Sequence, residues 1–239
     1  SFQQSRLRTG PGGSKNEFLS NDLNITNLVL SYDLGWASVT SSSSWIDYSA
    51  ANHSDISSLF FSPTYSSTND ESKVFIEELR LTSQFDGPLQ LLGGLYYEDR
   101  DSDINGGFFW SGDIALADPA VAIIPISQQT LLEQKAVFAE LTYEATEKLI
   151  ATVGVRHFDY EQVFDDFAFL SHNENNENGQ TYKMNLSYAL SDELLIYGQW
   201  VEGFRLGQAA AAPTSICDGN NDGILDDVGF PDPGPLQPD

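Results

Sequence analysis

The sequence predicts an all-β fold, an antiparallel meander of about eight strands that forms an open, curved part of a transmembrane β-barrel. Three observations lead to this prediction. Apolar and polar residues alternate with a period of two in successive segments, as in strands whose two faces meet different surroundings. Short connections alternate with long ones, as in outer-membrane barrels. The long connections also lack Lys and Arg throughout 51–72, 101–134, 157–182 and 206–239.

The clearest segment is a predicted hairpin at 133–161. Its two arms each alternate between an apolar and a more polar face. If Glu144 and Lys148 close the turn, Tyr143 lies opposite Leu149 and the apolar residues of both arms share one face. Each arm is about as long as the 9–11 residues that a tilted strand needs to cross a bilayer.

Further strands are expected on both sides of this hairpin. They are 24–32, 36–50, 74–83, 89–100, 182–189 and 194–206. Tight polar turns such as Asp33-Leu34-Gly35, in which glycine supplies a positive φ, connect some of them. The expected long loops are 51–71, 101–132, 164–179 and 207–239. Aromatic residues lie beside the short turns, as in the girdles of membrane barrels, at Tyr32, Trp36, Phe85, Tyr143, Tyr188 and Tyr197.

Composition excludes several classes of protein. Asp and Glu number 35 against 11 Lys and Arg, a net charge of −24, so binding of nucleic acid through its phosphates is not expected. A hydrophobic content of 41% with 12% aromatic residues is too high for a disordered chain. No apolar run reaches the roughly 18 residues of a transmembrane helix. The single Cys217 excludes a disulfide within the chain and leaves open a pairing with a cysteine elsewhere.

Three segments resemble consecutive barrel segments of TonB-dependent outer-membrane receptors. The firmest matches are ELRLTS at 78–83, GVR at 154–156 and GFRLG at 203–207. Together the segments run from about residue 72 to 207 in the order and spacing of that family. The resemblance implies a bacterial outer-membrane receptor and transporter rather than an enzyme.

The same resemblance implies a mechanism and partners. In this family a barrel of roughly 22 strands encloses a plug, and an inner-membrane TonB complex pulls on the plug to import ferric siderophores, haem, cobalamin or sugars. The implied partners are outer-membrane lipid, the TonB complex and a small-molecule substrate such as an iron chelate. No segment matches the plug, so residues 1–239 are expected to form one fragment of the barrel. Its strands would run from about 20 to 207, and 207–239 would be an external loop.

Charged residues within the predicted strands are candidates for the inner wall of such a barrel. They are Glu78, Arg80, Glu140, Arg156 and Arg205. An arginine facing lipid costs about 2–4 kcal/mol at mid-depth, so these side chains are expected to face the lumen. There they would either form ion pairs that keep the strands in register, or hold the plug and conduct substrate.

Three adjacent aromatic residues, Phe108, Phe109 and Trp110, are candidates for substrate binding in the expected 101–132 loop. Exposed aromatic side chains in a polar loop are suited to a flat hydrophobic ligand. The alternative is that they form the small core of the loop itself.

The last expected loop has oxygen ligands at the spacing of a calcium loop. Asp218, Asn220, Asp222 and Asp226 fill positions 1, 3, 5 and 9, with glycine at position 6. Gly229 stands where the bidentate glutamate of position 12 is expected. The alternatives are a calcium site and a metal-free turn, and no other cofactor is predicted.

Two other classes remain open from the sequence. One is a secreted acidic β-sandwich that binds carbohydrate or a cell surface, and the other is a small stand-alone outer-membrane barrel. Two packed sheets would indicate the first class, and a closed barrel would indicate the second. The substrate is not identified, because the loops match no family motif.

Overall fold

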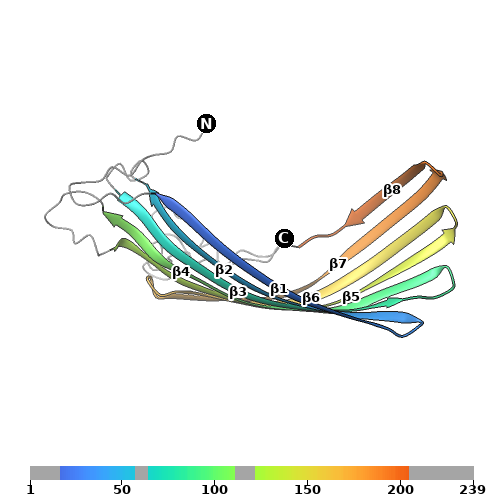
Figure 1. The fold of residues 1–239 in the computed structure, drawn as a ribbon, viewed down its shortest axis with the longest axis horizontal. Helices are drawn as coiled ribbons and strands as arrows, with labels where there is room; N and C mark the ends of the chain where they lie inside the picture. The colour runs from blue at the N-terminus through green and yellow to red at the C-terminus, as the bar shows by residue number, and fades with distance from the viewer. Residues whose placement is uncertain (1–16, 57–63, 111–121, 205–239) are drawn as a thin grey trace, which may run out of the picture.

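The computed structural model describes residues 17–56, 64–110 and 122–204. Its strands are β1 (Phe18–Asp33), β2 (Ala37–Asp55), β3 (Thr64–Ser83), β4 (Leu89–Trp110), β5 (Ala122–Thr146), β6 (Leu149–Asp166), β7 (Ser171–Ser191) and β8 (Leu194–Val201). They form one sheet in chain order, each strand antiparallel to the next (Figure 1). The predicted all-β meander is confirmed. Within the described residues, no helix is long and apolar enough to span a membrane.

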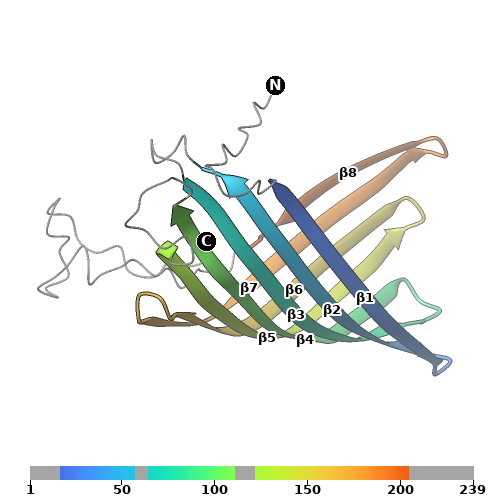
Figure 2. The same ribbon diagram turned by 60° about the vertical axis from the view of Figure 1, so that its left-hand side comes forward.

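The sheet is strongly curved and open. Figures 1 and 2 show a trough with β1 along one rim and β8 along the other. In the described part of the chain β1 pairs only with β2, and β8 pairs only with β7, so the sheet does not close on itself. This arrangement fits a sector of a barrel. It excludes two packed sheets and a closed eight-stranded barrel for the residues described.

The strands are longer than the sequence pattern predicted. β4 has 22 residues and β5 has 25, so much of the expected 101–132 loop is strand. β2 and β3 likewise extend into the expected 51–71 loop. The turns at 34–36, 84–88, 147–148 and 192–193 lie at one end of the sheet, here called the turn end, and the extra length lies at the opposite, distal end. There β2, β3 and β7 are largely polar on both faces, whereas β4 ends and β5 begins in short apolar runs. In neither case does a regular apolar–polar alternation mark the strand, although the backbone ladder continues.

The prediction of a long loop at 164–179 is wrong. β6 and β7 stay paired as far as Asp166, and only 167–170 form the turn. Asp166 stabilises this turn, because its Oδ1 accepts hydrogen bonds from the backbone N–H groups of Ala168 and Phe169 at 3.0 and 3.1 Å. A stretch rich in Asn and Glu is therefore strand, since its backbone groups pair with β6 regardless of side-chain polarity. The strict alternation of short and long connections fails here.

The predicted register of the 133–161 hairpin is wrong by two residues. Tyr143 lies opposite Ala151 rather than Leu149. The turn is tighter than expected because Thr146 pairs with Leu149, after a register shift that follows Glu144. Thr146 Oγ1 accepts the backbone N–H of Leu149 at 3.0 Å. Since side chains alternate with a period of two, a slip of two residues leaves every side chain on its predicted face.

The polarity of the two faces is inverted relative to a soluble sheet. Along β7 the exposed positions of its turn-end half are apolar, and the half-buried positions between them are polar. The exposed residues, at 44% to 55% exposure, are Tyr182, Met184, Leu186 and Tyr188. The polar face is the inside of the curve, because side chains converge there. Lys183 on β7 reaches across β6 to Glu140 on β5, with Nζ 3.0 Å from both carboxylate oxygens.

The buried apolar cluster is small and lies on the inner face. It consists of Leu132, Ala136, Phe158 and Tyr160, with Tyr96 and Phe204 packed against it. The Phe158 and Phe204 rings stack with their centroids 3.8 Å apart. Most other large apolar side chains of the described strands are exposed, so this sheet does not gain its burial from a conventional core.

Gly94 on the inner face of β4 leaves no space for a side chain. A Cβ at this position would lie 2.3 Å from the ring of Phe138 and 2.7 Å from the carbonyl oxygen of Leu79. We expect Gly94→Ala to destabilise the folded full-length protein by about 1–3 kcal/mol, the usual range for overpacking. Urea unfolding in detergent or lipid measures this change.

The matched control is Gly93→Ala, the next residue along β4. A Cβ there would meet only the carbonyl oxygen of Phe138, at an ordinary contact distance of 3.7 Å. The control is expected to change the free energy of unfolding by less than about 1 kcal/mol, as a substitution without a clash does. Equal losses in both variants would contradict the packing described for Phe138.

Candidate functional site

The outer face of the sheet carries an apolar belt. Its residues come from the turn-end parts of β3 to β8 and are 36% to 56% exposed. They include Leu79, Leu81, Leu91, Leu95, Val137, Val153, Val155, Met184, Leu186 and Ile196. Apolar side chains exposed in one continuous band need a non-aqueous surrounding or a partner surface.

Aromatic residues border this belt. At its distal border, Trp45 and Phe75 have ring centroids 5.4 Å apart, and Phe75 and Tyr97 follow at 6.3 Å. At the turn end, Tyr143 and Tyr188 lie beside their turns, as the sequence predicted. The distal aromatic row was not predicted from the sequence, because its three residues become neighbours only through the register of three strands. An apolar band between two aromatic girdles is typical of outer-membrane barrels.

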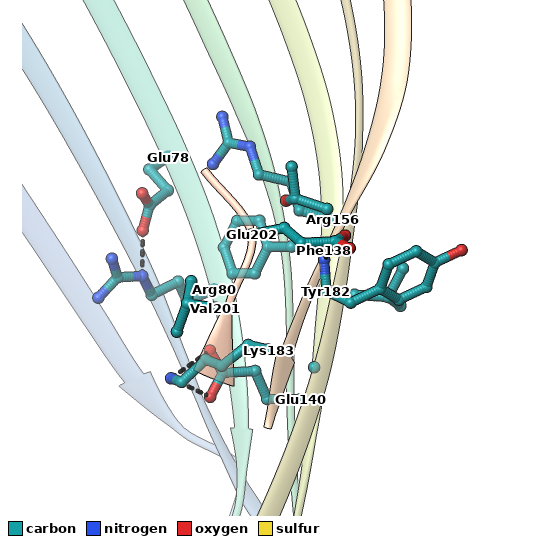
Figure 3. Close-up of a pocket in the computed structure, with 12 residues that line it drawn as sticks. Glu78, Arg80, Phe138, Glu140, Arg156, Tyr182, Lys183, Val201 and Glu202 are labelled. Atoms are coloured by element: carbon teal, nitrogen blue, oxygen red, sulfur yellow. Dashed lines mark hydrogen bonds and ion pairs between the residues drawn. The ribbon is translucent and has the colours of Figure 1, made fainter. Parts of the chain in front are cut away.

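The inner wall carries charged side chains in neighbouring cross-strand rows. Arg80 on β3 and Arg156 on β6 lie in one row, with Gly94 and Phe138 between them. Figure 3 shows Arg80, Phe138 and Arg156 gathered on one side of the ribbon. They line a hollow of about 280 Å³. Arg80 forms an ion pair with Glu78 on its own strand.

The next row contains the ion pair between Glu140 and Lys183, which spans three strands. Gly154 lies between the two residues in register, on β6. A Cβ at Gly154 would lie 3.0 Å from Cγ of Glu140, so the absence of a side chain gives the glutamate room to reach Lys183. Both carboxylate oxygens of Glu140 accept from Nζ at 3.0 Å, and both side chains are about one-third exposed.

Arg156 is the cation of this wall that has no carboxylate partner among the described residues. Its guanidinium carbon lies 4.8 Å from the centre of the Tyr96 ring, in a cation–π contact. Its Nε is buried and has no hydrogen-bond partner in the described part of the chain. Glu202 lines the same hollow, but its Oε2 accepts the backbone N–H of Tyr182 at 3.2 Å.

Tyr96 in turn belongs to a hydrogen-bonded group on β4. Its hydroxyl donates to Oε2 of Glu98 at 2.6 Å, and Nη2 of Arg100 donates to Oε1 at 2.6 Å. Glu98 is only 6% exposed, so these two donors stabilise a buried carboxylate. The group fixes the ring on which Arg156 rests.

The chemistry available to the wall follows from this charge pattern. Three cations of the wall are neutralised by a carboxylate, in the pairs Glu78–Arg80, Glu98–Arg100 and Glu140–Lys183. Arg156 is therefore the group best suited to bind an incoming carboxylate or another anion. The described residues contain no group of three or more His, Cys, Asp or Glu side chains that could hold a metal ion.

The charged residues predicted for the lumen lie together on the inner face, except Arg205, which lies outside the described residues. Sequence reasoning missed four members of this wall, Tyr96, Glu98, Arg100 and Lys183. Lys183 had a detectable signal, because it alternates with the apolar residues of β7. The contact of Tyr96 with Arg156 had none, since it depends on the register of three strands.

The three aromatic candidates lie at the end of β4 rather than in a loop. Alternation along β4 places Phe108 and Trp110 on the inner face and Phe109 on the outer face. Phe109 stacks on Tyr65, with ring centroids 5.2 Å apart. The three residues therefore do not act as one surface. The proposed calcium ligands Asp218, Asn220, Asp222 and Asp226, and also Cys217, lie outside the described residues.

One titrating group lies at the distal end, beyond the apolar belt. His172 Nδ1 is 2.6 Å from Oδ1 of Asp165, and its Nε2 is 3.1 Å from Oε1 of Glu174. These contacts raise the pKa of His172 above its ordinary value, chiefly through the hydrogen bond to Asp165. When it is protonated, the imidazole adds a positive charge to the acidic distal end of β6 and β7.

Together these features define a sector of an outer-membrane type of β-barrel with a charged inner wall. A model of the TonB-dependent receptor-like β-barrel family matches residues 2–235. The chain belongs to this family, whose members are receptors and transporters of the outer membrane. No curated protein matches the chain.

Solved structures share the fold at low sequence identity. The ferric yersiniabactin uptake receptor FyuA from Yersinia pestis has a TM-score of 0.65 and 15% identity over 84% of this chain. The siderophore receptor PiuA from Acinetobacter baumannii has a TM-score of 0.64 and 17% identity over 79%. The ferric citrate transporter FecA, unliganded, has a TM-score of 0.64 and 12% identity over 79%. The match covers 30%, 33% and 28% of those chains respectively, so this chain spans about a third of their length.

Proposed function

We propose that this chain is a sector of an outer-membrane receptor that imports a small-molecule substrate with energy from a TonB complex. The inverted polarity of the sheet carries the proposal. An exposed apolar belt between aromatic rows suits lipid, and a charged concave wall suits a plug and a solute path. Residues 1–239 would then be part of one barrel, with 207–239 as an external loop and the plug supplied by the rest of the full-length protein.

The two ends of the sheet support an orientation in the membrane. Outer-membrane barrels have short turns on the periplasmic side and longer strands and loops outside. We therefore place the turn end in the periplasm and the distal end outside the cell. The distal parts of β4 to β7 then project beyond the membrane, where polar residues on both faces meet water.

The proposed substrate class is an iron chelate. The matched structures support this class, since they are a ferric yersiniabactin uptake receptor, a siderophore receptor and a ferric citrate transporter. The segments 51–72, 101–134, 157–182 and 206–239, which include the distal parts of the strands, carry no Lys or Arg. Screening limits their negative field to about 8 Å in physiological salt. A neutral or weakly charged chelate suits these segments, whereas an anionic one requires cations such as Arg156 further inside.

Phe108 and Trp110 are the aromatic residues that we propose for contact with substrate. Both lie on the inner face at the distal end of β4, on the entry side of the proposed lumen. Phe109 points to the other face and packs on Tyr65, so we assign it no direct contact with substrate.

The proposal predicts that Arg156 is needed for uptake. In a strain that lacks the chromosomal copy, a full-length protein with Arg156→Gln is expected to take up radiolabelled iron chelate about tenfold more slowly than the wild type. This magnitude corresponds to the loss of one hydrogen bond to a charged group. Uptake is compared at equal amounts of folded protein in the outer membrane.

The control is Lys135→Gln, which removes a cation from the outer face. Lys135 pairs with Glu133 on its own strand and does not contact the inner wall. Its removal is expected to leave uptake unchanged. The assignment of the inner wall to transport would be wrong if both variants matched the wild type, or if both lost uptake equally.

A further inference from the structure

We propose that the outer face of β2 and β3 holds a lateral docking site for a second membrane protein, one that presents a lysine or arginine side chain to Glu77. The site consists of Ser41 and Ser43 on β2 and Glu77 on β3. This inference rests on the outer-membrane location proposed above. It concerns the lipid-facing surface rather than the lumen.

Glu77 points outward, within the apolar belt. It lies in direct register with Ser43 on one side and Tyr97 on the other. Its same-face neighbours along β3 are Phe75, which belongs to the distal aromatic row, and Leu79, which belongs to the belt. The carboxylate is therefore on the belt side of the aromatic row, because Glu77 is the next outward-facing residue after Phe75 in the direction of the turn end. Ionisable groups at such depth are costly in lipid and usually mark a functional contact.

Two serine hydroxyl groups hold this carboxylate. Ser41 Oγ donates to Oε1 of Glu77 at 2.7 Å, and Ser43 Oγ donates to Oε2. The intervening Ser42 and the following Ser44 face inward instead, where both accept from the amide of Asn27. The run of four serine residues thus forms hydrogen bonds on both faces of the sheet, and its two outward-facing residues orient Glu77.

No cation of the described residues reaches Glu77. Arg80 lies on the opposite face and pairs with Glu78. Lys135 lies in the same outer row beyond Tyr97, but it pairs with Glu133. An ionised carboxylate has about four acceptor positions, and the two hydroxyl groups occupy only two of them. The outward side of Glu77 is therefore complementary to a cationic donor.

The shape of this surface favours a protein segment as the occupant. The outward side chains at Ser41 and Ser43 are small, whereas Leu28 and Leu30 on β1 and Leu79 on β3 beside them are larger and 41% to 60% exposed. Small residues at a membrane interface let backbones approach closely, and polar ones add hydrogen bonds. A second copy that docked through the same surface would bring another Glu77 carboxylate to the site, since its exposed outward cation, Lys73, lies four residues further towards the distal end. We therefore assign the site to a different protein.

Photo-crosslinking of the full-length protein in native membranes tests this site. A photoreactive phenylalanine analogue replaces Leu79, the outward neighbour of Glu77, and in a control it replaces Val153 on β6. At position 79 we expect one discrete adduct, whose cross-linked peptide is a membrane segment containing Lys or Arg. Adding Glu77→Gln is expected to lower the adduct yield about tenfold, as for loss of a charged hydrogen bond. The control position is expected to give no such adduct.

Charge reversal makes the test specific to the pairing. Glu77→Lys is expected to abolish the adduct, and replacement of the partner's cation by glutamate is expected to restore it. The proposal would be overturned by an adduct that is insensitive to Glu77→Gln, or one that also forms at position 153. Adducts with lipid or a second copy alone, or no adduct at all, would also overturn it.

Uptake by the same strains separates this proposal from the proposed function. Glu77 does not contact the inner wall, so Glu77→Gln is expected to retain iron-chelate uptake while losing the adduct. If the wild type took up no chelate, the transport proposal would fail while the crosslinking result still decided the docking site.

Discussion

An arginine in place of Val153 is expected to prevent stable insertion of the full-length barrel. Val153 lies in the middle of the belt on β6 and is 45% exposed on the outer face. A charged arginine facing hydrocarbon at mid-depth costs about 2–4 kcal/mol, a large part of a typical net stability of about 5–15 kcal/mol. The measurement is the amount of heat-modifiable, folded protein in purified outer membranes, together with urea unfolding in lipid vesicles.

The neighbouring substitution Thr152→Arg provides the control. Thr152 lies on the inner face, where its hydroxyl is 3.1 Å from that of Thr142. An arginine there can extend into the lumen, so we expect a loss of about 1 kcal/mol or less beyond the lost hydrogen bond. If Thr152→Arg blocked insertion and Val153→Arg did not, the assignment of the two faces would be reversed.

The second large effect concerns the isolated 239-residue chain in water. We expect it to aggregate in plain buffer and to show β-structure by circular dichroism only in detergent or lipid. The outward belt has no surface to pack against, and the outer edges of β1 and β8 are unpaired among the described residues. Light scattering and circular dichroism, with and without detergent above its critical micelle concentration, measure this difference.

A monomer in plain buffer with a sharp, reversible thermal transition would contradict this expectation. Such behaviour requires that most of the apolar surface is buried from water. The detergent arm serves as the control for misfolding caused by preparation. A chain that failed to form β-structure in detergent as well would show that this sector does not fold without the rest of the barrel.

The directions of the side chains were predictable from sequence because alternation is a local property. Leu141 and Val153 were assigned to one face, and Glu140 and Arg156 to the other, without knowledge of the correct register. The hairpin prediction was wrong by two residues, yet it preserved both faces. The same periodicity indicated the strands of the apolar belt, where lipid-facing and lumen-facing positions differ most in polarity.

The distal strands were not predictable in the same way. The stretch His172 to Gly179 is polar on both faces, so its composition indicated a loop although it pairs with β6 residue by residue. Long-range backbone pairing sets its structure, and single-sequence periodicity does not report it. Phe109 was misplaced in a loop for the same reason.

The residues of the candidate site were easier to predict from the sequence than the contacts between them. The position of Arg156 over Tyr96 requires the register of β4, β5 and β6 together. Glu77 carried a readable signal, since it shares the outward parity of Leu79. Its contacts with Ser41 and Ser43 were not predictable, because they depend on the register of β2 against β3.

In our proposal the convex face meets lipid, and the concave face lines an aqueous or plug-filled lumen. Spin labels at successive positions 181–188 of β7, in the full-length protein with Cys217 replaced by Ser, test it directly. Collision with oxygen, which partitions into lipid, and with a water-soluble nickel chelate is measured at each position in bilayers. The labels at 182, 184, 186 and 188 are expected to favour oxygen, and those at 181, 183, 185 and 187 to be shielded from it. Oxygen accessibility without a period of two, or with the opposite phase, would contradict the account.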